Sequence, residues 1–134
     1  MIKIFEQFIK EAYDDKLEDV KETLLVKAID TEDLDIVKFF VEKDYDINTN
    51  EVLFSATFND DIFRYFLEKG AKVENLIDDH YMKRLHDKNV QKALIDYGHE
   101  TFVHDVPGFN NDLRNDPKYA DVIDRFERTD KYNI

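Results

Sequence analysis

Residues 36–44 read IVKFFVEKD, and the same pattern returns as IFRYFLEKG at 62–70 and as VQKALIDYG at 90–98. Each copy has apolar residues at its first, fifth and sixth positions, which is the spacing of one buried stripe on a helix. Gly70 and Gly98 end two copies, and glycine readily adopts the left-handed conformation that closes a helix; Asp44 takes this place in the first. We expect three similar helices that share one continuous core. Its predicted members are Ile36, Phe40, Val41, Ile62, Phe66, Leu67, Val90, Leu94 and Ile95.

A shorter helical pattern precedes each copy. These patterns lie at residues 24–29, 52–57 and 80–85. Residues that cap helices separate each short pattern from the long one that follows. The predicted turns are Asp30 to Asp33, Asn59 to Asp61 and His86 to Asn89. The chain has only three Gly and two Pro, too few for the frequent turns of a fold with many short strands, so an all-α fold is predicted.

This order of short helix, turn, long helix and closing residue resembles the ankyrin repeat family. Residues 23–29, TLLVKAI, stand where that family has T-P-L-H-x-A-A, and residues 34–48, LDIVKFFVEKDYDIN, follow its L-E-V-V-K-L-L-L-E-x-G-A-D-V-N. Residues 70–73, GAKV, keep its G-A-x-V. The resemblance covers roughly residues 22–100 and implies a solenoid of helical hairpins that binds other proteins. The connection from Asp44 to Leu53 is short, so the family's projecting β-hairpin fingers are expected to be stunted or absent.

Sequences on both sides of the repeats predict helices that cap the ends of the solenoid, since terminal repeats need a protected outer face. We expect a single domain in which residues 1–21 are the N-terminal cap, 22–100 the repeats, 101–115 a loop and 116–134 a C-terminal capping helix. The N-terminal cap is predicted as two helices. The first would carry Ile4, Phe5, Phe8, Ile9, Ala12 and Tyr13, and the second Leu17 and Val20. The C-terminal helix would begin at Asp116 and Pro117 and bury Tyr119, Val122, Ile123 and Phe126.

Composition limits the classes of function. The formal net charge is -12, and such a chain repels nucleic acid and anionic membranes, which favours a basic or neutral protein as the partner. No cysteine is present, which excludes disulfides and thiolate chemistry. The N-terminal residues lack the apolar core of a secretory signal, and no apolar run approaches the length of a membrane span. A cytoplasmic protein is expected.

Catalytic and metal-binding residues are not predicted. Ser55, the only serine, has no histidine or lysine spaced to activate it. Pairs of histidines are six and five residues apart, whereas two ligands on one helical face need a spacing of four. Neither a cofactor nor a metal is therefore expected. The alternative is a small enzyme or ligand-binding protein, whose site would lie around Tyr81, His80, His99 and His104.

A non-catalytic protein-binding module, in a narrower version an inhibitor or immunity-type protein, is the function that the sequence favours. Acidic residues are concentrated in the first 50, which carry 14 acids against 7 bases. Four of these acids crowd one turn, and aromatic side chains supply contact area at interfaces. The predicted partner-binding residues are Asp30, Glu32, Asp33, Asp35, Phe39, Tyr65, Phe58 and Asn59. A plain solubilising surface is the alternative for the acids, and packing between helices is the alternative for Phe39 and Tyr65.

Overall fold

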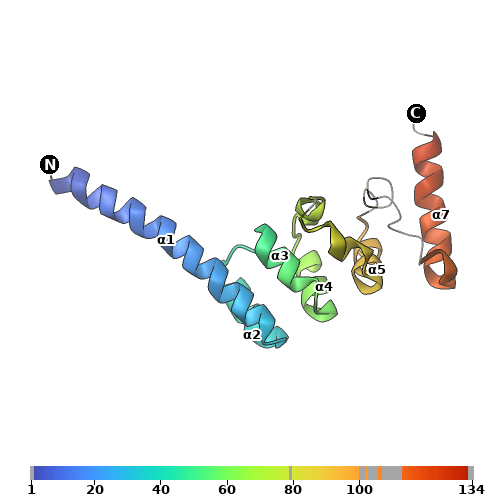
Figure 1. The fold of residues 1–134 in the computed structure, drawn as a ribbon, viewed down its shortest axis with the longest axis horizontal. Helices are drawn as coiled ribbons and strands as arrows, with labels where there is room; N and C mark the ends of the chain where they lie inside the picture. The colour runs from blue at the N-terminus through green and yellow to red at the C-terminus, as the bar shows by residue number, and fades with distance from the viewer. Residues whose placement is uncertain (1, 79, 100–101, 103–105, 107–112, 133–134) are drawn as a thin grey trace.

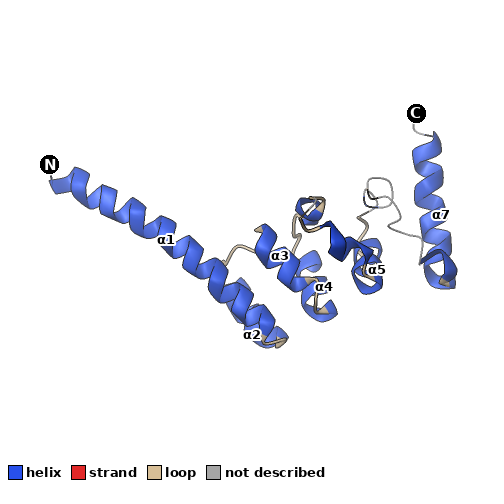
Figure 2. Ribbon diagram, viewed as in Figure 1, coloured by secondary structure: helices blue, strands red, loops and turns tan. Residues whose placement is uncertain are grey.

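The computed structural model describes residues 2–78, 80–99, 102, 106 and 113–132, with side chains for 16–78, 80–99, 102, 106 and 113–125. Within these residues the fold is all-α, as predicted, and contains no strand (Figure 2). The α-helices are α1 (Ile2–Asp30), α2 (Leu34–Glu42), α3 (Asn50–Ala56), α4 (Asp60–Glu68), α5 (Lys88–Asp96) and α7 (Pro117–Tyr132). Three 3-10 helices are η1 (Val73–Leu76), η2 (Met82–His86) and η3 (Leu113–Asn115). No helix among the described residues is long and apolar enough to cross a bilayer.

The helices follow one another along an elongated molecule, from α1 at one end to α7 at the other (Figure 1). Helix α1 packs against α2 and α3, α2 also packs against α4, and α4 packs against α3 and α5. The long helices α2, α4 and α5 each begin two residues before one of the three sequence copies. The copies therefore occupy equivalent positions on three successive helices.

The three predicted turns are helix starts, each with a side-chain cap. Asp33, Asn59 and Asp87 are the N-caps of α2, α4 and α5, and each side chain accepts backbone N–H groups of the first helical turn. These caps satisfy donors that have no partner inside the helix. Each predicted turn therefore contains the N-cap of a long helix, although Asp30 belongs to α1, Asp60 and Asp61 to α4, and Lys88 and Asn89 to α5.

The three long helices also end in the same way. Asp44, Gly70 and Gly98 have φ angles of 65°, 81° and 81°, the left-handed region in which glycine is least strained. The N–H of each donates to the carbonyl three residues earlier, and the next residue's N–H donates to the carbonyl five residues earlier. This pair of backbone hydrogen bonds is a Schellman motif. The predicted role of Asp44 as a substitute for glycine is confirmed.

Six of the nine predicted core residues are buried in one cluster, with Phe40 and Val41 partly buried against it. The prediction for Ile36 was wrong, because 40% of its surface is exposed. Its equivalents Ile62 and Val90 are almost fully buried. Helix α4 packs against the earlier long helix α2, and α5 packs against α4. Helix α2 is the first of the three long helices, so no earlier long helix covers Ile36. The second position of each copy is buried in all three, as Val37, Phe63 and Gln91.

The N-terminal segment forms one helix, and the predicted pair of capping helices is wrong. Helix α1 runs without interruption from Ile2 to Asp30 and crosses the expected boundary at residue 21. No glycine or proline lies in this stretch, and its many Glu, Lys and Leu residues favour helix, so nothing breaks the hydrogen-bond ladder. The N-terminal half of α1 extends away from the other helices (Figure 1).

At the other end, α7 begins at Pro117, as predicted, and the Asp116 carboxylate accepts the N–H of Lys118 at 3.1 Å. Tyr119 and Ile123 are buried and Val122 is partly buried, whereas the side chain of Phe126 lies outside the described residues. The Tyr119 hydroxyl donates to Asp96 of α5 at 3.1 Å. Most of the predicted loop at 101–115 also lies outside the described residues; Leu113–Asn115 within it form η3.

The third short helical pattern forms a 3-10 helix, η2, in place of an α-helix. Its buried Leu85 carbonyl accepts a hydrogen bond from the side-chain amide of Gln91 at 3.0 Å. This contact explains why a polar residue occupies a buried position of α5, since the amide supplies a donor to a carbonyl near the end of η2.

Candidate functional site

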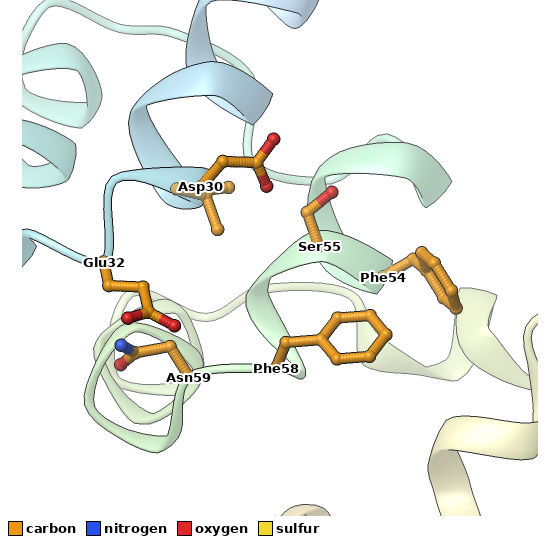
Figure 3. A pocket seen from close by; sticks show the side chains of 7 residues that line it. Asp30, Glu32, Phe54, Ser55, Phe58 and Asn59 are labelled. Atoms are coloured by element: carbon orange, nitrogen blue, oxygen red, sulfur yellow. The ribbon is translucent and has the colours of Figure 1, made fainter.

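A groove of about 260 Å³ lies between the C-terminal end of α1 and the helix α3. Helix α1 and its following turn contribute Ile29, Asp30 and Glu32, and α3 with its following turn contributes four more residues. These are Phe54, Ser55, Phe58 and Asn59. Figure 3 shows the two carboxylates on one side of this groove and the two phenylalanine rings on the other. The groove therefore joins an acidic wall to an aromatic wall.

The aromatic wall is built by Phe54 in α3 and Phe58 in the turn that follows it. Phe54 and Phe58 are four residues apart, and their rings meet edge to face with centroids 5.3 Å apart. Tyr81 extends this row, because its ring centroid lies 5.4 Å from that of Phe54. Its hydroxyl donates to Glu51 at 2.9 Å, and this hydrogen bond raises the pKa of the Tyr81 hydroxyl. The aromatic row of Phe58, Phe54 and Tyr81 thus spans from α3 to the start of η2.

Phe58 is 60% exposed, yet it is held in place. The guanidinium carbon of Arg84 lies 4.0 Å from its ring centroid, a cation–π contact. Arg84 also donates to the Thr57 hydroxyl at 3.0 Å and to the Thr57 carbonyl at 2.9 Å. These bonds fix the turn that carries Phe58, so the exposed ring is presented on an ordered backbone.

The acidic wall stands on a backbone turn that ends α1. Glu32 has a φ of 61°, uncommon for a residue with a side chain, and its N–H donates to the Ile29 carbonyl at 2.9 Å. The carboxylates of Asp30 and Glu32 make no hydrogen bond or ion pair with the described residues. Figure 3 shows the Glu32 side chain directed toward Asn59. Both carboxylates are therefore available to a cation from outside the chain.

Four of the eight predicted partner-binding residues, Asp30, Glu32, Phe58 and Asn59, line this one groove. Asn59 also has a structural role as the cap of α4. Asp33 does not line the groove; its carboxylate accepts the N–H groups of Asp35 and Ile36 at the start of α2. Reversing the charge of Asp33 would remove this cap, so it is a poor choice for testing binding. Asp35 is exposed on the first turn of α2.

Phe39 and Tyr65 do not form a shared exposed strip. Phe39 is 57% exposed, whereas Tyr65 is only 8% exposed and belongs to the core. Lys38 of α2 and Lys69 lie over the Tyr65 ring, with nitrogens 5.4 Å and 5.6 Å from its centroid. Burial, followed by the charges of Glu42 and Glu68, raises the pKa of Tyr65. The alternative interpretation, packing between helices, holds for Tyr65.

In the alternative enzyme site, His80 contacts Tyr81, but His99 makes its contacts elsewhere among the described residues. His99 pairs with Glu74 at 3.3 Å and its ring meets Phe102, whereas His80 packs on Tyr81 with centroids 4.8 Å apart. His104 lies outside the described residues. Among the residues that the structure describes, no group of three His, Asp or Glu is placed to hold a metal ion. Ser55 faces the groove, beside Asp30 in Figure 3.

Sequence reasoning missed Ile29, Phe54 and Ser55 as groove residues. The spacing of Phe54 and Phe58 was a usable signal, because side chains four apart share a helix face. The separation of 27 residues between Phe54 and Tyr81, close to the repeat length, was a second one. Neither signal identifies α1 as the opposite wall, since that depends on how the first two helix pairs pack.

Neither a protein-family model, nor a curated protein, nor a solved structure matches this chain.

Proposed function

We propose that this chain is a non-catalytic protein-binding module of the ankyrin-repeat type, and that the groove between α1 and α3 binds a basic segment of a partner protein. The observation that carries this proposal is the groove itself. It combines two carboxylates that make no hydrogen bond or ion pair with the described residues and an exposed aromatic surface, and it gathers residues from both of the first two helix pairs. Acidic proteins of this size suit the inhibition of a protein with a basic cleft, which is the narrower form of the proposal.

The repeated helix geometry supports the architecture in this proposal. Three long helices start with side-chain caps, carry the sequence copies in the same register and close with the same pair of backbone bonds. Each is preceded by a shorter helical segment in the sequence. Stacked helix hairpins of this kind present a continuous surface made of equivalent positions, which repeat proteins use to bind partners. The groove lies where the first two helix pairs meet, between the end of α1 and α3.

The chemistry of the groove favours an arginine or lysine side chain as the occupant. Arginine pairs with carboxylates and also stacks on aromatic rings, so a site that offers both suits it well. Phe58 already binds one guanidinium, that of Arg84, whose central carbon lies 4.0 Å from the ring centroid. A cationic residue of the partner would complete the arrangement between Phe58 and the carboxylates of Asp30 and Glu32.

The test compares two charge-neutralised variants that remove the same number of carboxylates. Asp30→Asn with Glu32→Gln alters the groove, whereas Asp61→Asn with Glu68→Gln alters exposed residues of α4. Proteins retained from the native source by the wild-type chain should fall at least about tenfold with the groove variant and persist with the control. Phe58→Ala should act like the groove variant. Equal retention by both double variants would contradict the proposal.

Salt dependence supplies a second measurement on the purified partner. If carboxylates steer the association, its rate should fall markedly as ionic strength rises from about 0.1 M to 1 M, because the Debye length shrinks from about 10 Å to 3 Å. The groove variant should lose most of this dependence. An association rate that ignores salt in the wild-type chain would rule out the electrostatic part of the proposal.

A further inference from the structure

Three exposed apolar residues of the first helix pair have buried equivalents in the second. By the alignment of the sequence copies, Leu24, Ile36 and Phe39 correspond to Val52, Ile62 and Tyr65. The first three are 41%, 40% and 57% exposed, whereas none of their equivalents exceeds 8%. The second pair is covered by the first, through contacts of α1 with α3 and of α2 with α4. The first pair therefore displays the surface that, one step along the chain, binds a helix pair.

Helix α1 extends this surface. Leu17, Val20 and Leu24 are all exposed and follow one another at spacings of three and four, so they form one stripe on the helix. Val20 and Leu24 also lie in a shallow hollow of about 340 Å³, whose other lining residues are Asp19, Thr23 and Lys27. We name Leu17, Val20, Leu24, Ile36 and Phe39 the end face. Contiguous apolar surface of this kind marks an interaction site.

The charged residues beside the hollow can pair with those of a second, antiparallel copy of the same helix. Asp19 and Lys27 lie four residues before and after Thr23, about 6 Å along the helix in each direction at 1.5 Å per residue. Neither side chain forms an ion pair within the described residues. An antiparallel copy of α1, related by a two-fold axis near Thr23, sets each Asp19 against the partner's Lys27. The same axis brings Val20 and Leu24 of each copy close to those of the other.

We propose that the end face binds a second copy of this chain, forming a two-fold dimer through antiparallel α1 helices. A two-fold interface uses the same patch twice and must therefore be self-complementary, which the Asp19 and Lys27 arrangement provides. Each copy uses its own end face in this interface, so no end face is left to bind a third copy. Association is therefore closed at two copies and does not continue as a filament.

The first measurement is the mass of the purified full chain by sedimentation equilibrium at about 0.15 M salt and tens of micromolar protein. The expected result is twice the chain mass of 16.0 kDa. Val20→Glu with Leu24→Glu should give the single-chain mass, whereas Tyr97→Glu, at an exposed residue just after α5, should remain dimeric. A wild-type chain that stays monomeric overturns the proposal, including the case in which a helix of another protein covers this face.

Charge reversal tests the antiparallel pairing itself and does not depend on the apolar variants keeping their fold. Asp19→Lys alone and Lys27→Asp alone should each weaken the dimer at least tenfold, because each places like charges opposite one another. Mixing these two variants should restore association as a heterodimer, and the double variant D19K/K27D should restore the homodimer. Single variants that dimerise like the wild type, or a mixture that fails to associate, would overturn the proposed pairing.

Discussion

Backbone conformation at single residues shows where the repeat pattern is strained. Asp44, Gly70 and Gly98 close three equivalent helices with positive φ angles, but only Asp44 carries a side chain there. Left-handed backbone costs a residue with a Cβ about 1–2 kcal/mol, less for Asp than for most others because its short polar side chain can bond locally. Glu32, at the end of α1, is held in the same region and belongs to the acidic wall of the groove.

This strain gives a matched pair of substitutions. Gly70→Ala should lower the free energy of unfolding by about 1–2 kcal/mol, because φ is 81°. No atom outside Gly70 and its two chain neighbours lies within 4 Å of the added Cβ, so the loss comes from backbone strain and not from a clash with other residues. Asp44→Gly should raise it by up to about 1 kcal/mol for the converse reason. Urea denaturation of both variants provides the measurement. A Gly70→Ala chain as stable as the wild type would show that the closing turn is not left-handed.

At the scale of helices, equivalent positions differ in burial because of their place along the chain. Ile36 and Ile62 occupy the same position of α2 and α4, yet only Ile62 is covered. Ile62→Ala should reduce the free energy of unfolding by about 2–5 kcal/mol, the usual cost of truncating a buried aliphatic residue. Ile36→Ala should cost less than about 1 kcal/mol when measured at protein concentrations low enough to keep the chain monomeric. Similar losses for the two variants would contradict the exposed position of Ile36.

The start of α7 should respond to acid. The Lys118 N–H, and to a lesser extent Lys92 at 3.4 Å, hold the pKa of the Asp116 carboxyl below its usual value, against a smaller opposing effect of burial. A carboxyl with a lowered folded-state pKa stabilises the fold above its unfolded pKa of about 3.9, and loses that contribution as pH falls below it. The stability difference between wild type and Asp116→Asn should therefore be constant above about pH 5 and shrink on acidification. Thermal melts from pH 7 to pH 3 provide the test, and Lys92→Met should reduce the effect.

Local sequence patterns predicted where the helices begin and end, but not which helices pack against one another. The positions of α2, α4 and α5, their caps and their closing residues follow from spacing and from Asp, Asn and Gly, which act within one helical turn. The exposure of Ile36 and the burial of Tyr65 depend on which helix lies beside them, and the apolar pattern alone does not specify this. Helix α1 was predicted as two helices, by analogy with the paired helices of the repeats. No Gly or Pro lies between Tyr13 and Leu17 to end the first of them.

At the scale of the molecule, the groove and the end face lie on different parts of the first helix pair. The groove uses Asp30 and Glu32 at the C-terminal end of α1, whereas the end face uses residues 17–24 of that helix together with α2. Val20→Glu with Leu24→Glu should therefore leave binding at the groove unchanged, whereas Lys27 lies three residues from Asp30 and its reversal alters the charge beside the groove. Four groove residues were predicted from their acidic, aromatic or polar character, but the groove itself and the end face were not, since both depend on how the helices pack.

The bond between Gln91 and the Leu85 carbonyl has a consequence for how the protein opens. The described residues of the segment 73–86 contain the short 3-10 helices η1 and η2, whose hydrogen bonds are poorer in geometry than those of the α-helices on either side. Amide hydrogens in this segment should exchange with solvent sooner than those of α4 and α5, through openings that leave both helices folded. Gln91→Leu removes the donor and should accelerate exchange at residues 85–87 most. Native-state hydrogen exchange, measured by mass spectrometry, should then divide the chain into two cooperative units, one before η1 and one after η2. Uniform exchange across all helices would contradict this division.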